Sequence, residues 1–198
     1  MKIYFDTEFT DLNKETELIS IGLVDEEGNT FYGEITDFDT NKCSDFVIGN
    51  VVPLLKYYNK GVDSFSRQVK KSNFNSLLAD EILGTKEEVR QYLLKWLDTK
   101  GDKIEWVSDC CHFDMVLLID LLYGNAFNMP IGKVCPGCHD TNQDIARIFN
   151  IDEVEAFNKN REEIVNGYCK TSLTNIDKHN ALYDAEVIRI IAKELIKL

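Results

Sequence analysis

Two acidic residues near the start of the sequence, Asp6 and Glu8, lie two positions apart in a segment of strand-forming residues. Because side chains alternate along a strand, both carboxylates point to one face and Thr7 points to the other. The apolar residues just before them place the pair at the end of a buried strand, where an uncompensated charge is costly. A divalent cation would remove that cost. An exposed acidic strand end explains this pair equally well when it is taken alone.

A second acidic position is Asp114, which follows a short apolar strand predicted at residues 104–107. It falls in the first turn of a helix predicted at residues 113–123, which Gly124 ends. Taken alone, a carboxylate there is explained more simply by its interaction with the helix dipole, worth about 0.3–1 kcal/mol. Asp109, just before this helix, is interpreted as a cap or turn residue.

The third group is H-N-A-L-Y-D at residues 179–184, where His179 and Asp184 are five positions apart. On a continuous helix this spacing separates them by about 140°. They converge only if His179 lies in the turn before a helix predicted at residues 181–198. An imidazole on a mobile loop would then face a carboxylate on a rigid helix. A helix-start histidine beside an incidental aspartate is the alternative.

Taken together and in this order, the three groups resemble the DEDDh exonucleases, which include proofreading exonucleases, RNase T and oligoribonuclease. The shared motifs are D-T-E-F-T at residues 6–10, F-D at 113–114 and H-N-A-L-Y-D-A at 179–185. They look most like those of small stand-alone prokaryotic and phage exoribonucleases. Asn180 stands where the tyrosine subclass carries Tyr, which indicates the histidine subclass. Residues 109–112 depart from the His-Asn pair of many relatives, and residues 36–80 match no family motif.

This resemblance implies an α/β fold of RNase H-like type, with a mixed sheet of about five strands flanked by helices. It implies a metal-dependent 3′-5′ exonuclease acting on single-stranded 3′ ends, with RNA favoured over DNA. By the same resemblance Asp6, Glu8, Asp114 and Asp184 bind two Mg²⁺ or Mn²⁺ ions and His179 is the general base. Hard cations prefer carboxylate oxygens, and two ions about 3.5–4 Å apart suit phosphodiester hydrolysis. A DNA-specific exonuclease and a non-catalytic nucleic-acid-binding module are the alternatives.

Substrate-binding candidates lie elsewhere. Residues 56–71 carry five positive residues, one negative residue and three aromatic residues, which is typical of a groove for single-stranded nucleic acid. Lys70 and Lys71 are its strongest candidates, and solvated helix surface is an equally good interpretation. Phe9, just beyond the acidic pair, is expected either to stack on a terminal base or to belong to the core.

The cysteines raise a different hypothesis. Four cysteines and two histidines lie within thirty residues, and Cys135 and Cys138 have the C-x-x-C spacing of half a zinc site. The second half, Cys110 and Cys111, is irregular because adjacent cysteines rarely bind one ion. Reduced thiols are therefore favoured over structural zinc and over a zinc-stabilised interaction protein.

The elements that position these residues must come from a chain of 198 residues, 44% of them hydrophobic, which fits one exonuclease domain over residues 1–198. The strands are expected at residues 2–9, 18–24 and 30–35, and further helices after Thr85 and at residues 141–149. A net charge of −12 excludes a polybasic tail, so any nucleic acid must be bound locally. Without a signal-type or bilayer-length apolar segment, a cytoplasmic protein with no membrane contact is expected. A second copy of the chain, in a homodimer, is a candidate partner.

Overall fold

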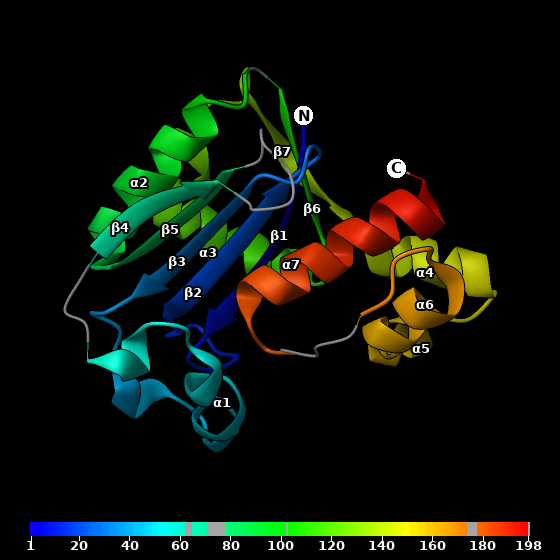
Figure 1. The fold of residues 1–198 in the computed structure, drawn as a ribbon, viewed down its shortest axis with the longest axis horizontal. Helices are drawn as coiled ribbons and strands as arrows, with labels where there is room; N and C mark the ends of the chain where they lie inside the picture. Colours follow the sequence, from blue (N-terminus) through cyan, green and yellow to red (C-terminus); the bar gives the residue numbers. More distant parts are fainter. Residues whose placement is uncertain (62–64, 71–77, 102, 174–177, 198) are drawn as a thin grey trace.

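The centre of the molecule is a mixed β-sheet. The structure is a computed structural model that describes residues 1–61, 65–70, 78–101, 103–173 and 178–197; for 66–70 it describes the backbone only. The described residues form seven strands in the order β4-β5-β3-β2-β1-β6-β7 (Figure 1). β1 lies between β2, to which it is antiparallel, and β6, to which it is parallel. This central strand carries the first acidic motif.

The elements follow the chain in an order typical of an α/β fold. The strands are β1 (Lys2–Phe9), β2 (Leu18–Asp25), β3 (Thr30–Ile35), β4 (Phe65–Lys70), β5 (Leu78–Gly84), β6 (Ile104–Ser108) and β7 (Val134–Asp140). The helices are α1 (Asp45–Asn50), α2 (Lys86–Asp98), α3 (Cys111–Tyr123), α4 (Thr141–Phe149), α5 (Glu153–Asn158), α6 (Arg161–Tyr168) and α7 (Ala181–Ile190). None of the helices formed by the described residues is long and apolar enough to cross a lipid bilayer.

Helices cover both faces of the sheet, and the alternation of side chains in β1 decides what each face contacts. Tyr4 packs with Val107 and Ile188 beneath α7, which runs across one face (Figure 1). Ile3 and Phe5 point to the opposite face, into the main core shared with α2 and α3. The even-numbered residues of β1, including both acids of the first motif, therefore face α7.

One glycine brings α7 close to the sheet. Gly22 in β2 is paired with Asp6 in β1. A β-carbon at position 22 would lie 2.3 Å from the carbonyl oxygen of Ala181 and 2.4 Å from the Cα of Leu182. Because no side chain larger than hydrogen fits there, the first turn of α7 rests directly on the strand beside the acidic pair.

The structure confirms the predicted α/β fold with a mixed sheet, consistent with an RNase H-like architecture. Thr85 and Glu88 form the capping box expected at the start of α2. The described residues form seven strands instead of about five, because β4, β5 and β7 were not among the four strands placed from the sequence. α3 begins at Cys111, two residues earlier than predicted. The helix predicted at residues 181–198 consists of α7, which ends at Ile190, and of a π-helix over Ile191–Ile196.

Candidate active site

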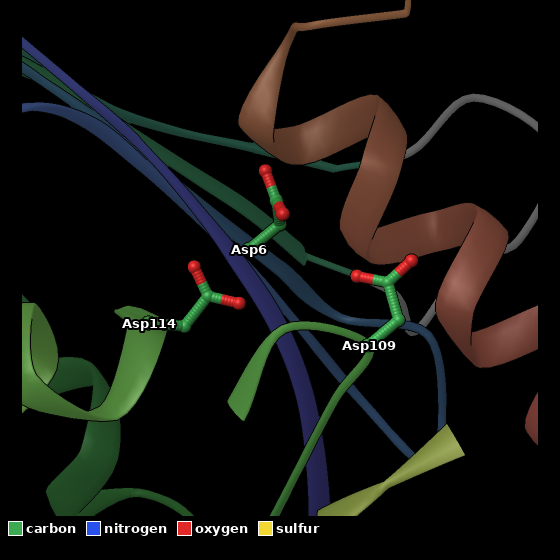
Figure 2. A group of neighbouring side chains, drawn as sticks. All are labelled: Asp6, Asp109 and Asp114. Carbon is green, nitrogen blue, oxygen red and sulfur yellow. The ribbon is translucent and has the colours of Figure 1, made fainter. Parts of the chain in front are cut away.

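Carboxylates from four elements meet at the end of β1. Oxygen atoms of Asp6, Glu8 and Asp184 lie within 4.8 Å of one another. A second group with the same spacing consists of Asp6, Asp109 and Asp114, whose carboxylates turn toward one shared space in Figure 2. Asp6 belongs to both groups. The arrangement thus offers two adjacent positions for a cation, with one carboxylate common to both.

These groups line a pocket of about 660 Å³ at this end of the sheet. Its walls include Phe46 from α1 and Phe157 from α5, both more than half exposed. Phe9 also lines the pocket, and its ring lies 6.3 Å from that of Phe113. The position of Phe9 is compatible with stacking on a terminal base, because its ring borders the pocket. It is equally compatible with a role in the core, because the ring packs against Phe113.

Asp114 is held from two sides. Its side chain is 1% exposed, and it accepts hydrogen bonds from the hydroxyls of Thr7, at 2.6 Å, and Ser108, at 2.5 Å. Thr7 can donate because it points away from the face that carries Asp6 and Glu8. Asp114 lies in the first turn of α3, as predicted, but the helix dipole alone does not describe its surroundings, because the carboxylate is buried beside Asp6 and Asp109.

His179 lies in the turn before α7, as its spacing from Asp184 requires. The helix begins at Ala181, with Asn180 as its N-cap. His179 has a left-handed backbone conformation with φ 70°, and its backbone N–H donates to the Asp184 carboxylate at 2.9 Å. Its ring packs edge-on against Phe46, with ring centres 5.2 Å apart. Burial, followed by the charge of Lys178, lowers the pKa of His179 from its ordinary value of 6.5, so the imidazole is neutral at pH 7.

Burial and mutual repulsion shift the protonation of the carboxylates. Burial, together with the charges of Asp114 and Asp184, raises the pKa of Asp6 well above its usual range. Burial and the same two neighbours raise the pKa of Glu8 to about 8. Burial raises the pKa of Asp114 and that of Asp184 to about 7. Neither Asp6 nor Glu8 accepts a hydrogen bond from the residues that the structure describes.

This donor set fits a divalent cation. All the converging groups are carboxylates, which are the ligands that Mg²⁺ and Mn²⁺ prefer. Two of them, Asp6 and Glu8, lack protein donors within the described part of the chain, so their oxygens are available to a ligand. A bound cation would favour their ionised forms and reverse the raised pKa values.

Asp109 is the site residue that sequence reasoning misplaced. It does lie in the bend between β6 and α3, but Cys110 is the N-cap of the helix, so the interpretation of Asp109 as a cap is wrong. Its carboxylate faces Asp6 and Asp114 and accepts a hydrogen bond from Nε of Arg161 at 3.0 Å. Arg161 and its neighbour Glu162, which also lines the pocket, come from α6. No sequence signal pointed to that helix.

The basic aromatic segment lies outside this pocket, and none of its described residues lines it. Tyr57 is buried and contacts the ring of Phe65 at 4.4 Å, and Tyr58 packs on Phe38. These contacts pack the rings against the fold, and stacking on bases stays a prediction. Residues 65–70 form strand β4, so the interpretation of this part as helix surface is wrong. Lys70 ends β4, an outer strand of the sheet, and Lys71 lies outside the described residues.

The cysteines do not gather as the zinc hypothesis requires. Sγ of Cys111 lies 2.8 Å from Sγ of Cys138, while Cys135 is exposed on β7. His139 pairs with Asp144 at 2.5 Å instead of turning to the cysteines. Among the residues that the structure describes, the groups of three or more potential metal ligands are the two acidic ones.

Comparison with known proteins places this site in a family. A family model described as the 3′-5′ exoribonuclease Rv2179c-like domain matches residues 1–196. The chain is also similar to two proteins of Mycobacterium tuberculosis, 3′-5′ exoribonuclease Rv2179c (strain ATCC 25618 / H37Rv) and 3′-5′ exoribonuclease MT2234.1 (strain CDC 1551 / Oshkosh). Identity to each is 40% over 55 residues, which cover 28% of this chain and 33% of the relative. Because the family model spans all three acidic motifs and His179, the chain belongs to the Rv2179c-like 3′-5′ exoribonuclease domain family.

Proposed function

We propose that this protein is a metal-dependent 3′-5′ exoribonuclease that removes nucleotides from single-stranded 3′ ends. The observation that carries the proposal is the pair of three-carboxylate groups joined through Asp6. Membership of an exoribonuclease domain family supports the reaction and the preference for RNA.

In this proposal Asp6, Glu8, Asp114 and Asp184 hold two Mg²⁺ or Mn²⁺ ions. When bound, such ions supply a nucleophile at neutral pH and stabilise the charge that develops on the leaving oxygen. The hydroxyls of Thr7 and Ser108 fix the orientation of Asp114. Both are donors to the ionised carboxylate and so favour the form that binds a cation.

His179 is proposed as the general base that accepts a proton from the attacking water. It is suited to this role because burial keeps the imidazole neutral at pH 7. The contact from its backbone N–H to Asp184 places it beside a proposed ligand without using either ring nitrogen. Its position before the helix leaves the side chain on a loop.

Substrate contacts are proposed on two surfaces. Phe9 lines the pocket beside the carboxylates and can stack on a terminal base, while Lys159 and Lys178 line the same pocket and can contact phosphates. Lys70 and Lys71 would extend the path of the strand along the outer edge of the sheet.

The test is hydrolysis of two 5′-labelled oligonucleotides, one RNA and one DNA, of the same sequence. With Mg²⁺ or Mn²⁺ we expect a ladder of labelled products that shortens from the 3′ end of the RNA, and no ladder with EDTA or with Asp6→Asn. A ladder on DNA alone would support the DNA-specific alternative. Binding of RNA without hydrolysis in either metal would contradict the proposal and indicate a non-catalytic binding module.

A further inference from the structure

Asp109 stands outside the four carboxylates of the family motif, yet it belongs to one of the two acidic groups. We propose that Asp109 is a fifth carboxylate ligand, which completes the cation position formed by Asp6 and Asp114, and that Arg161 orients it. This inference rests on the proposed function, because it assigns a residue to one of the two proposed cations.

The first support is the geometry of the group. Without Asp109, the second position would contain two carboxylates, Asp6 and Asp114, and one of these is shared with the first position. With Asp109 each position has three carboxylate oxygens within 4.8 Å of one another. Figure 2 shows the Asp109 carboxylate turned toward Asp6 from the loop after β6.

The second support is that the two carboxylate oxygens of Asp109 have different hydrogen-bond partners. Oδ2 accepts from Nε of Arg161, whereas Oδ1 accepts no hydrogen bond from the residues that the structure describes. One oxygen is therefore fixed by the protein and the other is available to a cation. Ligating carboxylates are commonly oriented by outer partners in this way.

Arg161 is itself held firmly enough to orient a ligand. Its side chain is 13% exposed, and besides Asp109 it donates to Asn142 Oδ1 and to the backbone carbonyls of Ala156 and Lys159. A guanidinium with this many acceptors has little freedom to leave the carboxylate. Its contacts also tie the start of α6 to the loop that carries Asp109.

The charges agree with two divalent cations. The two acidic groups contain five carboxylates, and Arg161 is the cation paired with one of them. When all five are ionised, this set carries four net negative charges, which two divalent cations balance. Arg161 therefore lets the site contain a fifth carboxylate without an excess of negative charge in the loaded state.

The experiment is a titration of the purified, metal-free chain of 198 residues with Mn²⁺, with free Mn²⁺ measured by electron paramagnetic resonance. We expect two ions per wild-type chain. Asp109→Asn should lower the affinity for the ion beside Asp114 at least tenfold and leave the affinity for the other ion within about twofold. Residues that orient metal ligands commonly change metal affinity about 10–100-fold. The matched control is Glu162→Gln, which removes a pocket carboxylate that belongs to neither group.

Equal effects of Asp109→Asn and Glu162→Gln would mean that only pocket charge matters, and would overturn the proposal. So would two ions of wild-type affinity in Asp109→Asn. Arg161→Gln should also lower the affinity for the ion beside Asp114 about tenfold. Combining it with Asp109→Asn should cause no further loss of affinity, because Arg161 acts through that carboxylate. Thermal melts of each variant check that it is folded.

Failure of the proposed function gives a different result. In that case the wild-type chain would bind no Mn²⁺ in this titration and give no RNA ladder. If only the role of Asp109 is wrong, the ladder and both ions persist, and Asp109→Asn binds them as the wild type does.

Discussion

Two acidic residues of the sheet, Glu34 and Asp6, differ in the hydrogen bonds that their carboxylates accept. Glu34 on β3 is fully buried and accepts hydrogen bonds from the backbone N–H groups of Lys56, Tyr57 and Tyr58 and from the Tyr32 hydroxyl. Asp6, in the candidate active site, accepts none from the described residues. A carboxylate that the fold supplies with donors stabilises the fold, whereas a carboxylate left without donors is available to a ligand. The following predictions test this difference.

The largest effect is expected at the shared ligand. Asp6→Asn should lower the rate of RNA hydrolysis at least about 10³-fold, because loss of the proposed cations removes several kcal/mol of transition-state stabilisation. The same change should raise the melting temperature of the metal-free protein, since it removes an ionisable group whose charged form burial and the neighbouring carboxylates disfavour. A decrease in that melting temperature would show that Asp6 stabilises the fold, as Glu34 does.

The next effect concerns the proposed base. His179→Ala should lower turnover about 10²–10⁴-fold, the usual contribution of general base catalysis. Mn²⁺ affinity should stay unchanged, because the imidazole is not among the converging ligands. The wild-type rate should rise with pH through a step below pH 6.5, because burial lowers the pKa of His179, and the variant should lose that step. An unchanged rate and pH profile would exclude His179 as the base.

Substitution of Glu34 should change the stability of the fold and leave the activity unchanged. Glu34→Gln leaves buried backbone donors facing an amide NH₂ group, and we expect a loss of about 3 kcal/mol in the free energy of unfolding. That corresponds to a melting temperature about 6–12 °C lower. The matched control is Glu163→Gln on the exposed side of α6, expected within about 0.5 kcal/mol of wild type. Hydrolysis per folded molecule should stay at the wild-type level in both.

The raised pKa values predict how stability depends on pH. Glu8 titrates at about 8, and Asp114 and Asp184 at about 7, against ordinary values of 4.5 and 3.8. Between pH 4 and 8 the folded state therefore binds more protons than the unfolded state, so stability should fall as pH rises through this range. Melting in EDTA should show this decrease, and Mg²⁺ should raise the melting temperature more at high pH than at low pH. A metal-free melting temperature that rises with pH would contradict the assignment.

The smallest effect is expected from the basic segment. Lys70→Glu combined with Lys71→Glu should weaken RNA binding and flatten its dependence on salt, because each phosphate contact adds roughly 0.7 to the single-strand slope. Turnover at saturating RNA should remain. The same affinity at every salt concentration, in wild type and variant alike, would leave this segment as ordinary surface.

Sequence reasoning reached the acidic motif because its signals are local. Alternation in β1 put Asp6 and Glu8 on one face and Thr7 on the other, and a spacing of five placed His179 before the helix. Both arguments need only the geometry of one element, and the structure agrees with both.

Residues that depend on long-range contacts were missed. β5 was not predicted because Asp80 and Glu81 interrupt its apolar residues; Glu81 is buried in contact with Lys56 and Tyr57, more than twenty positions away. Asp109 resembles an ordinary turn residue until Arg161, from a helix with no motif, is placed beside it. Such partners become visible only when the chain is folded.

Gly22 shows how far the requirements of catalysis extend beyond the pocket. It contributes no side chain to the acidic groups, yet the absence of a β-carbon sets the separation between β2, which pairs with β1 at Asp6, and the helix that carries Asp184. A methyl group there would push α7 away from the sheet and Asp184 away from Asp6, and misplacement of catalytic groups by about 1 Å can cost about 100-fold in rate. A mutational screen scored on RNA hydrolysis is therefore expected to show as large a loss at Gly22 as at the proposed ligands, and a redesign of β2 for stability has to keep glycine at this position.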